Sequence, residues 1–157
     1  MSFERARDHL AGLGLEGRIL TFDVPSATVD QAAAAVGVAP ERIAKSLTFL
    51  VHGAPVLVVV AGDARVDNPA FKATFGAKAS MLGIDQAPEL IGYPVGGVCP
   101  FAVAAGVRVC LDKSLRRFET VYPACGDAAS AVELTLPELE RASGSTDWVS
   151  VTRLPGS

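Results

Sequence analysis

The sequence predicts a mixed α/β fold of the α+β type, in which helices surround a mixed β-sheet. Two β-favouring apolar runs, 46–51 and 55–61, flank a His-Gly-Ala turn and indicate a hairpin. The stretches with helix-capping signals are isolated and do not alternate regularly with strands, which favours this class over a parallel βαβ array. The chain has 157 residues, of which 50% are hydrophobic and 20% charged, so we expect one domain spanning residues 1–157.

The first 45 residues should supply short elements with recognisable ends. Thr28 with Gln31 three positions later is typical of a capping box, and Gly37 suits the left-handed residue that ends a helix. The elements expected here are a helix over 4–13, a strand over 18–23, a helix after Thr28 and a brief helical turn from Pro40.

The remainder alternates helical and strand signals around one irregular stretch. Residues 92–101 hold three glycines and two prolines, which predicts a shaped loop. The other expected elements are a helix from Asp67 to about Phe75 closed by Gly76, a strand over 78–82, a short helix over 85–91, strands over 107–112, 119–122 and 131–134, a helix after Thr135 with Glu138 completing a capping box, and a final strand including 148–151.

Charge and hydropathy exclude several classes of protein. The net charge of −3 argues against non-specific coating of nucleic acid, and no DNA partner is expected. The centre, 41–117, carries nine basic and six acidic residues, which fits either solvated surface charge or a small phosphate-contacting face. No apolar run approaches the roughly 20 residues of a membrane span, and the charged start lacks the apolar core of a signal peptide. We therefore expect a cytoplasmic protein without membrane contact.

The cysteines and histidines do not follow a metal-binding or disulfide pattern. Cys99, Cys110 and Cys125 are odd in number and widely spaced, and the two histidines, His9 and His52, form no HExxH motif. We expect reduced thiols, no metal and no cofactor. A GxSxG elbow and a Walker-type loop are also absent from the sequence, which removes support for serine hydrolase and P-loop readings.

Two features are candidates for chemistry. Lys45 stands directly before an apolar run, at the mouth of an expected strand, where its side chain either reaches solvent or points into a cleft. In a cleft its ammonium could contact a phosphate, a carboxylate or a developing oxyanion. The loop Gly96–Pro100 could present backbone amides to an anion, or it could be an ordinary tight turn.

Other polar and aromatic residues have weaker claims. Cys99 is a candidate nucleophile, but a small, partly buried loop residue is the simpler reading because no histidine is near it in sequence. Four residues of the C-terminal third could order a water or a substrate amine, although each could equally be a cap, turn or surface group. They are Asp112, Asp127, Ser130 and Glu133. Phe22, Phe49 and Trp148 are expected to be core residues and not base-stacking platforms.

Three segments together resemble the YbaK/ProX family, the free-standing relatives of the editing domain of bacterial prolyl-tRNA synthetases. They are Ile-Ala-Lys-Ser-Leu-Thr-Phe at 43–49, Val-Leu-Val-Val-Val-Ala-Gly-Asp at 56–63 and Gly-Tyr-Pro-Val-Gly-Gly-Val-Cys-Pro-Phe at 92–101. The resemblance covers about residues 20–140. It implies a curved, largely antiparallel sheet and metal-independent hydrolysis of the ester joining an amino acid to the 3′ adenosine of tRNA.

Residue by residue, the resemblance assigns the site. Lys45 matches the family's essential lysine, and Gly96 and Pro100 match its loop motif of the form GlyXaaXaaXaaPro. The implied mechanism is positioning and electrostatic stabilisation of an oxyanion, with water or a substrate group as nucleophile. The residues expected to contact substrate are Ser46, Gly97, Val98, Cys99, Phe22, Asp112 and Ser130.

The activity implied is trans-editing deacylation of a mischarged small amino acid, Ala, Ser, Thr or Cys, from tRNA. The expected partners are the aminoacyl-tRNA 3′ end and, as a further candidate, an aminoacyl-tRNA synthetase. Ser46 and Cys99 depart from residues common in the family and leave the amino acid open. The alternative is a non-catalytic tRNA- or synthetase-binding module of the same fold, and a hydrolase built on Cys99 is a third reading.

Overall fold

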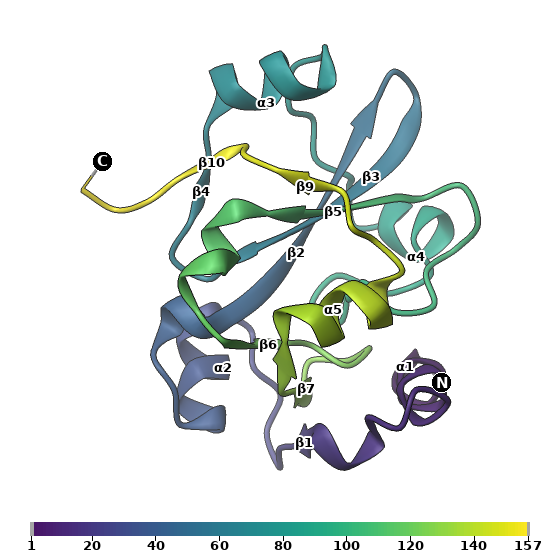
Figure 1. Ribbon diagram of the computed structural model, residues 1–157. Helices are drawn as coiled ribbons and strands as arrows, with labels where there is room; N and C mark the ends of the chain where they lie inside the picture. Colours follow the sequence, from purple (N-terminus) through teal and green to yellow (C-terminus); the bar gives the residue numbers. More distant parts are fainter. Residues whose placement is uncertain (1, 157) are drawn as a thin grey trace.

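A computed structural model describes residues 2–156, and in it helices surround a central sheet (Figure 1). In that view α3 lies at the top beside β4 and β10, α2 lies beside the start of β2, and α1 and α5 lie at the lower right. The α-helices are α1 Ser2–Ala11, α2 Val29–Val36, α3 Asn68–Phe75, α4 Gln86–Leu90 and α5 Leu136–Ser143, and the 3₁₀ helices are η1 Glu16–Arg18, η2 Pro40–Arg42 and η3 Lys113–Arg117.

In the described residues the strands form a mixed six-stranded sheet, in the order β8-β6-β2-β3-β5-β9, and two small ladders, β1-β7 and β10-β4. Both small ladders are antiparallel, as are β2/β3 and β6/β8, whereas β2/β6, β3/β5 and β5/β9 are parallel. The strands are β1 Ile19–Thr21, β2 Ile43–Val51, β3 Ala54–Ala61, β4 Arg65–Val66, β5 Arg108–Asp112, β6 Thr120–Pro123, β7 Ser130–Val132, β8 Leu134–Thr135, β9 Trp148–Val149 and β10 Thr152–Arg153.

The β2–β3 hairpin is the centre of the sheet and its longest ladder. Its turn residues, His52 and Gly53, both have positive φ angles of 49° and 80°, as a type I′ turn requires. The side chains of β3 from Leu57 to Ala61 are all fully buried, as expected of a central strand covered on both faces. The predicted hairpin and the predicted mixed, largely antiparallel sheet are confirmed.

Helix ends follow the predicted capping chemistry. The Thr28 side chain accepts a hydrogen bond from the backbone N–H of Gln31, and Gly37 ends α2 in the left-handed conformation. Thr135 and Glu138 form the expected capping box of α5. Asp67 caps α3 through the N–H of Ala70. These signals involve neighbours in sequence, which explains why they could be recognised without tertiary structure.

Several expected strands differ from the observed ones. Strand β2 begins at Ile43, so Lys45 lies within the strand and not directly before it. The segment 78–82 forms only a single bridge to β2, between Phe49 and Met81, made by two backbone hydrogen bonds, from the Leu50 N–H to the Ser80 carbonyl and from the Leu82 N–H to the Thr48 carbonyl. The 131–134 run is divided into β7 and β8, which pair with different strands.

The expected strand over 18–23 is also shorter, because η1 takes its first residue and β1 ends at Thr21. Phe22 therefore lies half-buried in the following loop. It was predicted to be a core residue, but it is not part of the hydrophobic core. Phe49 is a core residue, and Trp148 packs against the core while its indole N–H donates to Glu140. No helix within residues 2–156 is long and apolar enough to cross a membrane.

Candidate active site

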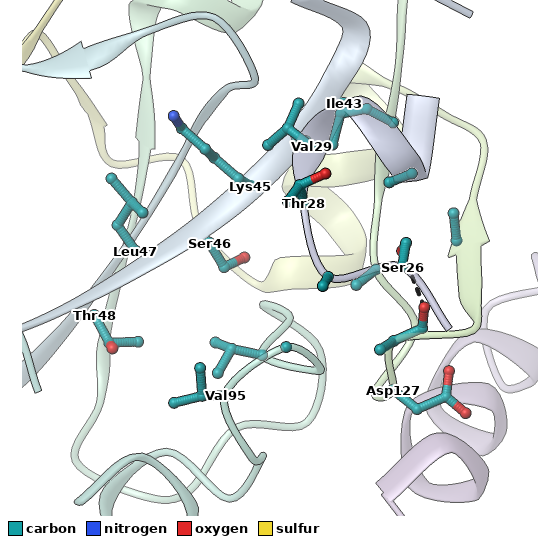
Figure 2. A pocket seen from close by; sticks show the side chains of 18 of the residues that line it. Ser26, Thr28, Val29, Ile43, Lys45, Ser46, Leu47, Thr48, Val95 and Asp127 are labelled. Carbon is teal, nitrogen blue, oxygen red and sulfur yellow. Dashed lines mark hydrogen bonds between the residues drawn. The ribbon is translucent and has the colours of Figure 1, made fainter. Parts of the chain in front are cut away.

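A pocket of about 400 Å³ opens between β2, the N-terminal end of α2 and two irregular loops (Figure 2). One side, which we call the strand wall, consists of residues 43–48 of β2. The opposite side, the loop wall, consists of Val95, Gly96 and Val98 together with pocket residues of the segment 124–131. Pockets of this size commonly hold small molecules or the end of a larger ligand.

Lys45 places a half-buried cation on the strand wall. It pairs with Val60 of β3, so the position of its backbone is fixed by the central ladder. Burial lowers the pKa of its ammonium from the ordinary value, and the nearby Arg65 guanidinium lowers it further, while the Asp63 carboxylate partly opposes both. A desolvated ammonium interacts more strongly with a negative charge than one in water does.

Ser46 carries an orphaned hydroxyl. Its Oγ is buried and is the only buried side-chain N or O atom in residues 2–156 without a hydrogen-bond partner. Figure 2 shows Ser46 and Thr48 on the opposite side of β2 from Lys45 and Leu47, with the Ser46 hydroxyl directed into the pocket. Leaving a buried hydroxyl unpaired costs about 1–3 kcal/mol, so a ligand that supplies the missing partner would be favoured.

The loop wall presents backbone groups. Gly96, with φ of +95°, and Val98 line the pocket, and within residues 2–156 the N–H groups of these two residues have no hydrogen-bond acceptor. Gly97, Cys99 and Pro100 are buried in the loop and do not line the pocket. The GlyXaaXaaXaaPro motif therefore divides into residues that face the pocket and residues that hold the loop in place.

Two loops meet behind this wall. A Cβ on Gly97 would lie only 2.7 Å from the carbonyl oxygen of Gly126, so the two backbones are in direct contact. Asp127 Oδ1 accepts hydrogen bonds from the N–H of Ala129 at 3.0 Å and from Ser130 Oγ at 2.7 Å. Ser130 thus lines the pocket, but its hydroxyl donates to the carboxylate that shapes the loop.

Helix α1 supports the loop wall from below. The Arg5 guanidinium stacks over the Tyr93 ring, with 4.2 Å from Cζ to the ring centroid, and its Nη2 donates to the carbonyl oxygen of Gly92. A Cβ on Gly126 would lie 2.4 Å from the carbonyl oxygen of Ser2, so the second loop also rests against the start of α1. Sequence reasoning missed this contact because the partners are about 90 or more residues apart.

Asp112 and Phe22, which were also expected to bind substrate, lie outside the pocket lining. Asp112 is 1% exposed and accepts hydrogen bonds from the N–H of Ser114 at 3.0 Å, the N–H of Val151 at 2.9 Å and Thr152 Oγ1 at 2.6 Å. Its oxygens therefore cap η3 and fix the segment after β9, and it does not line the pocket. Phe22 is not a lining residue either.

Glu133 and Cys99 are also committed to other roles. Glu133 Oε2 accepts a hydrogen bond from Tyr122 Oη at 2.6 Å. Cys99 is fully buried, and burial raises the pKa of its thiol to about 11. A thiol of this kind has little thiolate at neutral pH and no access to a substrate, which argues against the Cys99-based hydrolase.

Sequence reasoning also missed an apolar rim at the pocket mouth. Met81, Ile84 and Val95 are 60%, 76% and 59% exposed, and all three line the pocket. Large exposed apolar side chains gathered at a cavity indicate contact with a ligand. Their positions in sequence carried no signal: Met81 lies in the segment 78–82 that was expected to pair as a strand, and Ile84 lies between it and the expected helix over 85–91.

Together these features define a class of protein: a domain with a mixed sheet and one pocket that is lined by a lysine, a buried hydroxyl without a partner and backbone N–H groups without acceptors. Within residues 2–156 no three His, Cys, Asp or Glu side chains form a group that could hold a metal ion.

Comparison with known proteins identifies the family. The model of the aminoacyl-tRNA editing domain matches residues 23–142, and the chain belongs to this family. It is 47% identical to the uncharacterized protein YwhH of Bacillus subtilis (strain 168), over 98% of each chain. It is 34% identical over 89 residues to a proline–tRNA ligase of Geobacillus thermodenitrificans, a match that covers 56% of this chain and 16% of the ligase.

Two solved structures share the whole fold. One, described as hypothetical protein APE2540, has a TM-score of 0.85 and 31% identity, covering 95% of this chain and 99% of its own. The other was proposed to be a trans-editing enzyme for prolyl tRNA synthetase and has a TM-score of 0.87 and 25% identity, covering 97% of each chain. The predicted resemblance to free-standing editing domains is confirmed, and helix α1 lies outside the matched family region.

Proposed function

We propose that this protein is a trans-editing deacylase that hydrolyses the ester of a small amino acid, Ala, Ser, Thr or Cys, on mischarged tRNA. The observation that carries the proposal is the lining of one pocket: Lys45 and Ser46 at neighbouring positions of a rigid strand, the Ser46 hydroxyl without a partner, and Gly96 and Val98, whose N–H groups have no acceptor, on the opposite wall. Membership of the editing family supports the same reaction.

The chemistry would proceed by attack of water on the ester carbonyl. A bond forms between the water oxygen and the carbonyl carbon, and the negative charge moves to the carbonyl oxygen. The ester bond then breaks, the ribose 3′ oxygen leaves with a proton derived from the water, and free amino acid and tRNA are released. The charged state lies between these steps, so groups that stabilise the oxyanion accelerate the reaction.

We assign that stabilisation to the two backbone N–H groups and to Lys45, which lines the pocket although its side chain leaves β2 on the other side from Ser46. The ammonium supplies positive charge in a partly desolvated site, and the amides supply fixed donors. One such donor contributes on the order of 10²–10³ in rate in other acyl-transfer enzymes. Because these groups suffice for the proposed step, the mechanism requires neither a metal nor a cofactor.

The lining of the pocket fits an aminoacyl group that has both apolar and polar parts. Val95, Val98 and Leu82 give an apolar surround, while the Ser46 hydroxyl seeks one polar partner, such as the α-amino group or a side-chain hydroxyl or thiol. Apolar contacts alone distinguish one methylene by only about 1–3 kcal/mol, so the Ser46 contact would contribute to selectivity. The aminoacyl-tRNA 3′ end is the proposed partner, with a synthetase as a second one, and we expect the protein to act in the cytoplasm, where charged tRNA is found.

The test is deacylation of radiolabelled Ala-, Cys-, Ser-, Thr- and Pro-tRNA by the wild-type protein and by Lys45→Ala. We expect rapid release from one or two of the substrates and a loss of at least about 100-fold in the variant. Lys72→Ala, on the exposed surface of α3, is the matched control. If no substrate is hydrolysed above buffer while tRNA still binds, the deacylase proposal fails and a binding module of the same fold replaces it.

A further inference from the structure

Two arginines face each other directly on the small β4–β10 ladder. Arg65 and Arg153 are opposed in its antiparallel register, and both side chains are exposed. Directly opposed residues project from the same face of a ladder, with their Cβ atoms about 4.5–5.5 Å apart. Like charges in this arrangement repel each other, so the pair calls for a compensating anion.

No carboxylate of the described residues supplies that compensation. Within residues 2–156 the ion pairs join Arg7 to Asp8, Arg18 to Glu138, Arg108 to Asp147 and Arg117 to Asp63, and none of them involves Arg65 or Arg153. Asp63 and Asp67 each lie two residues from Arg65 in sequence. Both carboxylate oxygens of Asp63 accept hydrogen bonds from the Arg117 guanidinium, and Asp67 Oδ1 accepts one from the N–H of Ala70. The positive charge of the Arg65–Arg153 pair is therefore left for a ligand.

The pair lies near the start of the strand wall. Ala61, the last residue of β3, pairs with Ala44 beside Lys45, and Arg65 follows Ala61 by four residues, so the turn that carries Arg65 is close to Lys45. The effect of the Arg65 guanidinium on the pKa of the Lys45 ammonium agrees with this position. The chain as a whole carries a net charge of −3 and cannot attract RNA by its overall charge. A local group of cations beside the pocket would supply that attraction where the ligand enters.

We propose that Arg65 and Arg153 together bind a backbone phosphate of the RNA strand whose 3′ end occupies the pocket. Two guanidinium groups can donate several hydrogen bonds to one phosphate, a geometry that arginine offers and lysine does not. The identification of RNA as the ligand rests on the proposed function. The phosphate chemistry rests on the arginine pair itself.

The experiment compares the double variant Arg65→Gln/Arg153→Gln with wild type and with the control Arg18→Gln/Arg141→Gln. The control removes two exposed arginines that do not line the pocket, so both variants change the net charge equally. Binding of uncharged tRNA and steady-state deacylation are measured from 50 to 300 mM salt. Thermal melting of all three proteins checks that they fold.

For the Arg65/Arg153 variant we expect tRNA affinity to fall on the order of tenfold at low salt, and KM to rise similarly with little change in kcat. The slope of log affinity against log salt should flatten by about 0.7, because the two arginines together neutralise one single-stranded phosphate. Its melting temperature should equal or exceed that of wild type, because the repulsion is removed.

Affinity and salt slope equal to those of the Arg18/Arg141 control would overturn the proposal. So would a wild-type protein that does not bind tRNA. If the wild type hydrolyses no charged tRNA but the Arg65/Arg153 variant alone loses binding, the phosphate site stands and the proposed deacylation fails. If the protein deacylates tRNA and neither arginine affects this activity, the proposed deacylation stands and the phosphate site fails.

Discussion

The strand wall and the loop wall of the pocket are built in different ways. The strand wall belongs to β2, which is held against β3 by a ladder running from Ala44/Ala61 to Val51/Ala54. The loop wall has no such ladder and depends on close backbone contacts and on support from α1. A regular strand fixes the groups proposed for chemistry, whereas the irregular loops determine how closely a ligand can approach them.

Gly97→Ala tests the difference between the two walls most strongly, because the added Cβ disturbs the loop wall and leaves the strand wall unchanged. The added Cβ would lie 2.7 Å from the Gly126 carbonyl oxygen and 2.9 Å from the Asp127 Cα, so the two loops must separate. We expect a loss of deacylation on the order of 10- to 100-fold and destabilisation of about 1–3 kcal/mol. Kinetics and urea unfolding measure the two effects.

Gly17→Ala is the matched control, since a Cβ there meets no heavy atom within 4 Å and the residue has no positive φ. If both alanine variants deacylate equally, the close contact between the loops does not shape the site.

Ser46→Ala tests the strand wall. Removing an unpaired buried hydroxyl should leave the free energy of unfolding unchanged or raise it by up to about 1 kcal/mol. The rate of deacylation should nevertheless fall about tenfold for the amino acid that forms a hydrogen bond with this hydroxyl, and less for the others. Equal effects on every charged tRNA would show that the hydroxyl does not select the amino acid.

Arg5→Ala should have a smaller effect, transmitted through α1. The variant loses the contact with Tyr93 and the bond to the Gly92 carbonyl, worth about 1 kcal/mol at an exposed site. We expect a fall of about threefold in kcat with KM nearly constant, since the loop would sample non-productive positions. Arg7→Ala, on the same helix but paired with Asp8, should behave as wild type. A change in KM with no change in kcat in Arg5→Ala would contradict the proposed support of the loop by Arg5.

The pH dependence of stability should show the smallest effect. The folded-state pKa of Lys45 is lowered, so at intermediate pH the unfolded chain binds more protons than the folded one. The cost of burying the ammonium is fully present below the folded pKa and disappears as pH rises toward the ordinary value of 10.5. Relative to Lys45→Met, wild-type stability should therefore rise between these values. Parallel pH profiles of the two proteins would be evidence against a desolvated Lys45.

The comparison between walls also separates what could be predicted from what could not. The hairpin, the caps at Thr28 and Thr135 and the irregular loop at 92–101 follow from residues close together in sequence. Lys45 and Gly96 could be assigned from the family motifs and do line one pocket. Their roles in catalysis stay predictions.

Residues whose partners are distant in sequence could not be assigned. Asp112 has the chemistry of a ligand-binding carboxylate, but its partners Val151 and Thr152 lie about 40 positions away and occupy its oxygens. Phe22 looked like a strand residue, and only the early end of β1 placed it in a loop outside the core. Cys99 lies within the loop 92–101, and its burial likewise depends on the residues that pack against this loop.

The sequence by itself determined the helix ends, the central hairpin and the motifs that place this chain among the editing domains, because capping, turn chemistry and apolar patterning act between near neighbours. Only the tertiary structure decided that α1 supports the loop wall, that the Ser46 hydroxyl is left without a partner and that Arg65 opposes Arg153. Such facts depend on which groups remain to satisfy one another after the chain has packed, and packing brings together residues that no local pattern connects.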